Sequence, residues 1–512
     1  MNKRNKRYLE NNINKKIEEV NSLLNKKIIS DDIEVNIMAI QKLFENDDSL
    51  IIRNFTNINN NTKFFIIYSN GMVNTKVIND NIITPLMIID NKDKVNIVDN
   101  IINKVLLADD IKKVRTLKEV IEVVTYGDTV LFIEGSNVAI IINTKNFKIR
   151  SLEEPVSERS LLGPREGFNE SFIVNLSLIK RRLRTNELKA KFMSIGKQSN
   201  TQICICYMNN IVDPKILDQV YEKLNKINID GIIDSNYLDE LLSDNKYSIF
   251  KSIGKSEKPD YIATKLLEGK IAIIVDGSPV VLTIPYLFIE NFQTSEDYYI
   301  NFYYASIQRI IRIIGFIFAI ITPALYICVV AFHHELLPPQ LFIHFLLERQ
   351  SVPLPAIIEV IILLVAFDIL KEAGIRMPSN IGQALSIVGA LVIGQAAVEA
   401  KLVAAPMIIV VALTGITSLL VPKLNTATLI VRNFLLIIAS LFGFFGLVVG
   451  INILLIHIFN LKSFGIYQID FANIFSKKTD KNSIFRFPWN KQKYRNSTIT
   501  DNVTKLSIGG NS

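Results

Sequence analysis

The sequence has few of the side chains on which enzymes and disulfide-bonded proteins depend. It contains three cysteines, four histidines and one tryptophan among 512 residues. Three thiols exclude a disulfide scaffold, and Cys204 and Cys206 alternate along an expected strand, which favours buried side chains over a redox pair. His333, His334 and Glu335 adjoin each other in sequence, which is a poor arrangement for chelating a metal ion.

Motifs for catalysis are also missing from the sequence. No glycine-rich phosphate loop, dinucleotide-binding motif or nucleophile elbow occurs. We therefore expect that the protein is not an enzyme and that it has no catalytic residues, no metal site and no cofactor.

Net positive charge is concentrated at the C-terminal end. The chain carries +8 overall, but residues 461–512 hold nine Lys and Arg against three Asp and Glu, whereas residues 1–300 are neutral. A nucleic-acid-binding protein needs a broad positive face, so nucleic acid is not the expected partner. A basic tail after an apolar block indicates a membrane protein whose tail stays at the cytosolic face.

Apolar runs dominate the chain between residues 301 and 460. Two of them, Ile310–Phe332 and Phe434–Phe459, exceed the ~20 residues that a helix needs to cross ~30 Å of hydrocarbon. Three shorter or more polar runs are Leu354–Leu370, Ile381–Val398 and Leu402–Val421. Together they predict an all-α transmembrane domain of four to five apolar segments.

The two ends of the chain are expected on the same side of the membrane. The first 20 residues lack the apolar core of a secretory signal, and the positive-inside bias keeps the tail in the cytosol. Both ends inside require an even number of crossings, yet five apolar segments are present. Ile381–Ala400, which carries Gln383, Gln395 and Glu399, is the segment expected not to cross fully.

Small and acidic residues supply the candidate site. A stripe of small side chains either allows close helix packing or lines a narrow wet path for ions. The pore-lining or helix-packing candidates in the expected incomplete crossing are Gly382, Ser386, Gly389 and Gly394. In the last apolar run the packing candidates are Ala439, Gly443, Gly446 and Gly450. Glu359 is the intramembrane acidic candidate, for an ion path or a contact between helices, because a charge in lipid is costly.

The first 300 residues predict a cytosolic α/β region of two subdomains, residues 1–150 and 151–300. In the first, strands are expected at Lys63–Tyr68, Val130–Glu134 and Val138–Asn143, and helices at Val95–Leu107 and Leu117–Val124. In the second, strands are expected at Gln202–Tyr207, Ile271–Val275 and Val280–Ile284, and helices at Pro214–Leu224 and Tyr261–Leu267. A basic helix over Glu170–Arg184 presents either a solvated face or a surface for anionic lipid.

Four segments resemble the A subunit of GerA-type nutrient germinant receptors of bacterial spores. They are Gly163–Phe168 with the following NESFIVNLSLIKRRLR, Leu267–Pro279, Val352–Arg376 and Ile381–Glu399. The similarity in order and spacing extends from about residue 150 to about residue 470.

The resemblance implies an integral protein of the spore inner membrane, with its N-terminal region and basic tail on the spore core side. It implies two partners, a transporter-like B subunit that senses nutrient and a lipoprotein C subunit. It also implies a homo-oligomer, a pentamer, that forms a nutrient-gated channel, releases monovalent cations and triggers germination, with Gly382–Gly394 lining the pore. Two alternatives remain open, a secondary transporter and a non-conducting signalling scaffold of the receptor.

Overall fold

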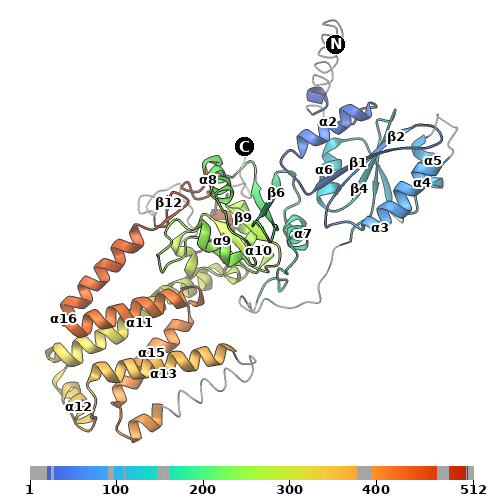
Figure 1. Ribbon diagram of the computed structural model, residues 1–512. Coiled ribbons are helices and arrows are strands. Elements are labelled where there is room, and N and C mark those ends of the chain that lie inside the picture. The colour runs from blue at the N-terminus through green and yellow to red at the C-terminus, as the bar shows by residue number, and fades with distance from the viewer. Residues whose placement is uncertain are drawn as a thin grey trace. The chain divides into compact units, whose positions relative to one another are not determined.

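The computed structural model describes residues 20–24, 28–89, 97–108, 110–146, 158, 162–376, 394–469, 484–502 and 504. Contacts divide the chain into two units. Unit 1 comprises Met1–Ser243, Ile253–Pro285 and Tyr494–Lys505, and unit 2 comprises Asp244–Ser252, Tyr286–Lys493 and Leu506–Ser512. Unit 1 holds two β-sheets and unit 2 holds the long helices (Figure 1).

The first sheet of unit 1 has five antiparallel strands in the order β1-β2-β4-β5-β3. Their bounds are β1 (Leu50–Thr56), β2 (Lys63–Ser69), β3 (Ile111–Val114), β4 (Thr129–Ile133) and β5 (Ala139–Ile142). Alternate side chains of β2 and β4 enter two separate cores, because successive residues of a strand point to opposite faces. Phe65 and Phe132 pack with α2 (Ile33–Leu43) and α6 (Leu117–Thr125), whereas Ile66 and Leu131 pack with η1 (Ile78–Ile83), α4 (Thr84–Ile88) and α5 (Ile97–Lys104).

The second sheet repeats the topology of the first. Its five antiparallel strands have the order β6-β7-β9-β10-β8, the same permutation as in the first sheet. The strands are β6 (Leu188–Ile195), β7 (Thr201–Met208), β8 (Gly254–Ser256), β9 (Ile271–Val275) and β10 (Val281–Ile284). The helices are α7 (Phe172–Arg182), α8 (Pro214–Asn225), α9 (Ser235–Leu242) and α10 (Pro259–Leu267). In each half a helix precedes the first strand, further helices follow the second strand, and one helix follows the third.

Unit 2 contains the apolar helices of the C-terminal half. They are α11 (Phe302–Ile327), continued by η4 (Cys328–Phe332), then α12 (Pro339–Gln350), α13 (Ala356–Arg376), α15 (Ala405–Leu419) and α16 (Asn425–Phe459). Within the described part of the chain, two helical stretches, Phe302–Phe332 and Pro422–Phe459, have the length and apolar composition needed to cross a bilayer. The predicted fold class, an α/β region followed by long apolar helices, is confirmed.

Helix α16 is broken in its middle and folds back on itself (Figure 1). Gly443 has φ 60° and ψ −141°, a conformation that only glycine adopts readily. A Cβ atom on Gly450 would lie 2.8 Å from Cδ2 of Leu435, although 15 residues of straight helix span about 22 Å. The apolar run Phe434–Phe459, expected as one membrane span, therefore belongs to two arms, residues 425–442 and 444–459.

Candidate functional site

Both ends of α16 lie beside one segment, residues 286–293, which leads into α11. At the start of α16, Nζ of Lys423 donates a hydrogen bond to the carbonyl oxygen of Gln293 at 3.0 Å. Beyond its end, the backbone N–H of Phe288 donates to the carbonyl oxygen of Gln468 at 3.2 Å. The two arms therefore begin and end at the same level of unit 2, which we call the near level.

The turn between the arms lies at the opposite end of α11. A Cβ atom on Gly443 would be 3.0 Å from Cγ of Phe332 and 3.2 Å from Cε1 of His333, where the η4 extension of α11 ends. We call this end the far level. At 1.5 Å per residue the arms are about 27 and 24 Å long, so each one runs alongside most of the apolar part of α11.

Glu359 lies at the far level and connects three helices. Its side chain is 1% exposed, and Oε1 lies 3.8 Å from Nη2 of Arg349 at the end of α12. Oε2 accepts a hydrogen bond of 3.2 Å from the backbone N–H of Ala404, the residue that precedes α15. A carboxylate at this position satisfies a free N–H group and also stabilises the positive end of the helix dipole. These contacts give Glu359 the geometry of an inter-helix residue.

A second charged cluster marks the near level. Nη2 of Arg432, in the first arm of α16, lies 2.6 Å from Oδ2 of Asp368 in α13. Lys371 of α13 donates to Oγ of Ser418 and to Oδ1 of Asn425, both at 3.2 Å. The end of α13, the end of α15 and the start of α16 therefore meet. No local sequence pattern predicts the Asp368–Arg432 pair, because 64 positions separate the two residues.

The small-residue candidates are only partly described. Gly382, Ser386 and Gly389 lie outside the described residues. A Cβ atom on Gly394 would lie 3.5 Å from Cγ2 of Ile408, in the first turns of α15 and thus toward the far level. The described residues that flank 377–393 therefore lie toward opposite levels, since Lys371 is at the near level and Gly394 is toward the far one.

The packing candidates of the last apolar run lie at and after the turn of α16. Gly443 makes the turn, and Gly446 and Gly450 face the first arm, at Ile438 and Leu435 respectively. Ala439 is fully buried in the core between α11 and α16. Gly446 and Gly450 thus allow close packing between two parts of the same helix.

The α11 helix begins beside a buried ion cluster. Oδ2 of Asp297 accepts a hydrogen bond from Nε of Arg309 at 2.8 Å, and Oδ1 accepts one from Nη1 of Arg312 at 2.9 Å. Asp297 is fully buried and Arg309 is 1% exposed. The acidic partner was not found from sequence, although Arg309 and Arg312 follow it by 12 and 15 positions.

In unit 1, two of the segments that carry the family resemblance meet. The backbone N–H of Gly277 donates to the carbonyl oxygen of Glu170 at 2.7 Å, and Asp276 accepts a hydrogen bond from the backbone N–H of Phe172. Oγ of Ser278 donates to Asp234, the residue that caps α9, at 2.5 Å. Burial alone raises the pKa of Asp234, but the hydrogen bonds from Ser278 and from the start of α9 outweigh it, so the pKa is lowered.

The basic helix α7 is held by protein partners. Nζ of Lys180 lies 2.8 Å from Oδ2 of Asp47, and both side chains are buried. Arg181 and Arg182 each bind Glu166, at 2.6 and 2.7 Å. These three basic side chains therefore form ion pairs within unit 1. They form neither the solvated face nor the lipid-binding face that the sequence predicted as alternatives.

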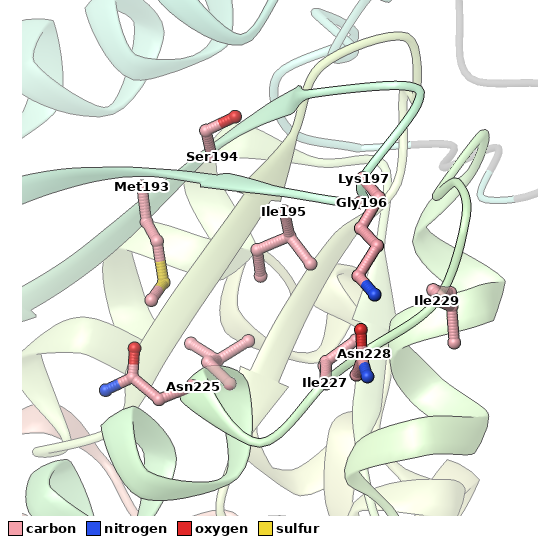
Figure 2. Close-up of a pocket in the computed structure, with 10 residues that line it drawn as sticks. Met193, Ser194, Ile195, Gly196, Lys197, Asn225, Ile227, Asn228 and Ile229 are labelled. Carbon is pink, nitrogen blue, oxygen red and sulfur yellow. The ribbon is translucent and has the colours of Figure 1, made fainter.

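A shallow pocket lies where β6 ends and α8 ends (Figure 2). Its volume is about 340 Å³, and Lys197, Asn225 and Asn228 surround an apolar floor that includes Ile195 and Leu224. All three polar side chains are exposed. The pocket thus lacks the buried polar groups that usually orient a ligand.

Metal and thiol chemistry have no site in the part of the chain that the structure describes. No cluster of three or more His, Cys, Asp or Glu side chains that could hold a metal ion occurs there. The Sγ atoms of Cys204 and Cys206 lie 3.5 Å apart in the core of the second sheet. Burial raises the pKa of the Cys204 thiol, which disfavours the reactive thiolate.

The fold and the helical layer define a class, a protein with a duplicated α/β region and a C-terminal helical part fit for a membrane. The family model of the Bacillus/Clostridium GerA spore germination protein matches residues 38–498. Spore germination protein KA of Bacillus subtilis is 36% identical over 90% of this chain and 86% of its own length. The uncharacterized membrane protein YfkQ of the same organism is 36% identical over 90% of each chain.

The chain belongs to the GerA family of spore germination proteins, which confirms the resemblance seen in the sequence. A crystal structure of the N-terminal domain of the A subunit of the Bacillus megaterium germinant receptor GerK3 is also similar. It is 26% identical, with a TM-score of 0.40, and covers 51% of this chain and 97% of that domain. The members of this family are A subunits of spore germinant receptors, and these receptors are multi-subunit complexes.

Proposed function

We propose that this chain is the A subunit of a nutrient germinant receptor that oligomerises in the spore inner membrane into a nutrient-gated channel. The channel releases monovalent cations and so triggers germination. Membership of the GerA family carries the receptor part of the proposal. The partners are a transporter-like B subunit, a lipoprotein C subunit and further copies of this chain, as a pentamer, and the protein performs no enzymatic reaction.

The directions of the described helices support a membrane topology of six crossings. Contacts at the two levels indicate that α11 runs from near to far, α13 from far to near, and α15 from far to near. Because α13 ends and α15 begins at opposite levels, we infer one further crossing between them, and the two arms of α16 supply the last pair. On this proposal Ile381–Ala400 crosses the membrane, contrary to the expectation from counting segments, because α16 contributes two crossings in place of one.

An even number of crossings agrees with the contacts of the tail. Nε of Arg495 donates to the carbonyl oxygen of Leu267 at 2.8 Å, and Nδ2 of Asn502 donates to that of Asn210 at 2.8 Å. The chain therefore returns to unit 1 after α16. We propose that unit 1 and the basic tail both lie on the spore core side of the membrane.

The pore proposal concerns the crossing that contains Gly382, Ser386, Gly389 and Gly394. Small side chains leave backbone and hydroxyl groups free to face ions. The flanks of this crossing lie toward opposite levels, so a path along it would connect the two faces of the membrane. Glu359, held between three helices, is proposed as a support for the far end of this bundle.

Bulky substitutions in spores test the pore. Gly389→Leu and Ser386→Leu are compared with Ala412→Leu, which places the same side chain on an exposed position of α15. We expect the two pore variants to abolish nutrient-triggered release of monovalent cations while the receptor is still present in the membrane, and the Ala412 variant to keep it. Unchanged release in both pore variants would favour a non-conducting scaffold. Release that requires a counter-transported ion would favour a secondary transporter.

A further inference from the structure

Exposed aromatic rings gather around the start of α11. The exposed fractions are 70% for Tyr303, 56% for Tyr304, 52% for Phe485 and 58% for Trp489. Tyr and Trp are enriched where a membrane meets water, because each ring has an apolar body and a polar group. Two of these four rings come from α11 and two from residues 484–493, which return to α11 from almost two hundred positions later in the chain.

Arg486 fixes the returning segment on α11. Its backbone N–H donates to Oγ of Ser306 at 3.0 Å, and that hydroxyl group contacts the carbonyl oxygen of Arg486 at 3.2 Å. Its guanidinium group donates to the carbonyl oxygen of Tyr298 at 3.2 Å and lies 5.2 Å from the centre of the Trp489 ring. Arg486 is only 5% exposed, so it holds Trp489 in place as a buried support.

An apolar stripe continues from the aromatic rings along α11. Tyr303 is followed at intervals of four, four, three and four by exposed apolar side chains, which places all of them on one face. These side chains are Ile307, Ile311, Ile314 and Phe318, between 45% and 53% exposed. The rings therefore lie at the near end of a face that is fit to contact lipid chains.

Two exposed lysines, Lys491 and Lys493, follow Trp489 in the returning segment. The buried Asp297 carboxylate accepts hydrogen bonds from Arg309 and Arg312. Burial lowers the pKa of Arg486, and the neighbouring Arg309 lowers it further, as expected where cations are crowded together. A bilayer surface rich in anionic phosphate groups complements this charge, and each Lys or Arg near such a surface strengthens binding.

We propose that residues 484–493 and the start of α11 form an interfacial anchor that binds the headgroups of anionic phospholipids. In this anchor Tyr303, Tyr304, Phe485 and Trp489 lie in the headgroup layer, and Lys491 and Lys493 contact lipid phosphates. The inference rests on the membrane insertion in the proposed function, because α11 must span the bilayer for its start to lie in this layer. If this anchor forms, the lipid composition of the membrane acts directly on the start of α11, the first crossing.

The single tryptophan of the chain makes the anchor measurable. The full-length protein is reconstituted into nanodiscs of phosphatidylglycerol or of phosphatidylcholine, and Trp489 emission is recorded with acrylamide as an aqueous quencher. We expect a blue shift and weaker quenching in phosphatidylglycerol. Lipids brominated close to the headgroup should quench Trp489 more strongly than lipids brominated near the chain ends.

Charge variants identify the lysines that contact lipid. Lys491→Gln/Lys493→Gln should remove most of the difference between the two lipids, whereas Lys76→Gln/Lys215→Gln, which removes two exposed charges from unit 1, should retain it. Free inorganic phosphate added to phosphatidylcholine discs should not reproduce the shielding, since the proposed ligand is part of a surface.

Three results would overturn the anchor. One is equal acrylamide quenching in both lipids, another is shielding produced by free phosphate alone, and the third is shielding that depends on protein density in the disc, which would assign the face to a second copy of the chain. A protein that fails to enter nanodiscs at all would instead contradict the membrane insertion of the proposed function.

Discussion

The carboxylate of Glu359 accepts a hydrogen bond from the backbone N–H of Ala404, 45 positions later in the chain. This contact joins the start of α13 to the start of α15, and Arg349 brings α12 to the same point. A buried acidic group is thus used to fix the ends of three helices. The residue singled out because a charge in lipid is costly has the partners that make such a charge tolerable.

Removal of the Glu359 carboxylate should destabilise the helical part. Glu359→Ala removes the carboxylate 3.8 Å from Arg349 and leaves the Ala404 N–H without an acceptor, and an unsatisfied buried donor costs about 1–3 kcal/mol. Glu359→Gln keeps an acceptor for Ala404 and should cost less than half as much. Thermal unfolding of the detergent-solubilised protein measures both variants. Equal stability of the Ala and Gln variants would show that the hydrogen bond to Ala404 contributes nothing.

The fold-back of α16 predicts a specific cross-link. With Leu435→Cys and Gly450→Cys on the two arms, we expect a disulfide to form on mild oxidation, because these positions touch across the turn at Gly443. Leu435→Cys paired with Ile456→Cys is the control, since position 456 lies further along the second arm. A straight α16 would separate positions 435 and 450 by about 22 Å, and the absence of a cross-link would contradict the two-armed helix.

Gly443 should tolerate no other residue without cost. Gly443→Ala must adopt φ 60° and ψ −141°, which costs about 1–3 kcal/mol, and its new Cβ atom would also press on Phe332. We expect lower thermal stability and loss of the 435–450 cross-link. Ser440→Ala, a half-buried position in the preceding turn, should change neither property.

Asp234 predicts a pH-dependent contribution to the stability of unit 1. Its pKa is lowered in the folded state, so the ionised carboxylate stabilises the fold above the ordinary aspartate pKa of ~3.9, and this contribution is lost as the pH falls through the lowered value. Asp234→Ala should cost about 1 kcal/mol at pH 7 through loss of the α9 cap, and Asp234→Asn less. A melting series from pH 7 to pH 2 should show the difference between wild type and Asp234→Ala shrinking at low pH, and a constant difference would refute the assignment.

The buried Lys180–Asp47 pair should show strong coupling. Asp47→Ala leaves a buried lysine cation and should cost about 3–5 kcal/mol, whereas Asp47→Leu combined with Lys180→Met removes both charges and should cost much less. A double-mutant cycle on the unfolding free energy measures the coupling. Additive effects of the two single changes would show that the pair does not join the two halves of unit 1.

Strand and helix positions followed from local pattern, but their pairing did not. The run KFFIIY predicts a strand, because a central strand carries apolar residues on both faces. The structure has this strand as β2 and extends it by one residue, to Lys63–Ser69. The repeated strand order of the two sheets could not be read from sequence, since it depends on pairings such as β3 with β5 that no local pattern specifies.

The sequence predicted which small and acidic residues are candidates for the site, but it did not predict their contact partners. Glycine spacing indicated close packing for Gly446 and Gly450, but a glycine in an apolar run fits a straight interface and a turn equally well. The structure shows that Gly443 has a positive φ and that it lies against Phe332 and His333. The partners of Glu359 and Arg432 lie on other helices, so their charges could be flagged from sequence but not paired.

Current recording from the reconstituted receptor tests the central claim most directly. The complex of this chain with its receptor partners is placed in planar lipid bilayers, and monovalent cation current is recorded before and after the germinating nutrient is added. We predict discrete conductance steps that require the nutrient and disappear in the Gly389→Leu variant but persist in Ala412→Leu. A complex that binds nutrient and passes no current, or current that is the same in the Gly389→Leu variant, would contradict the channel.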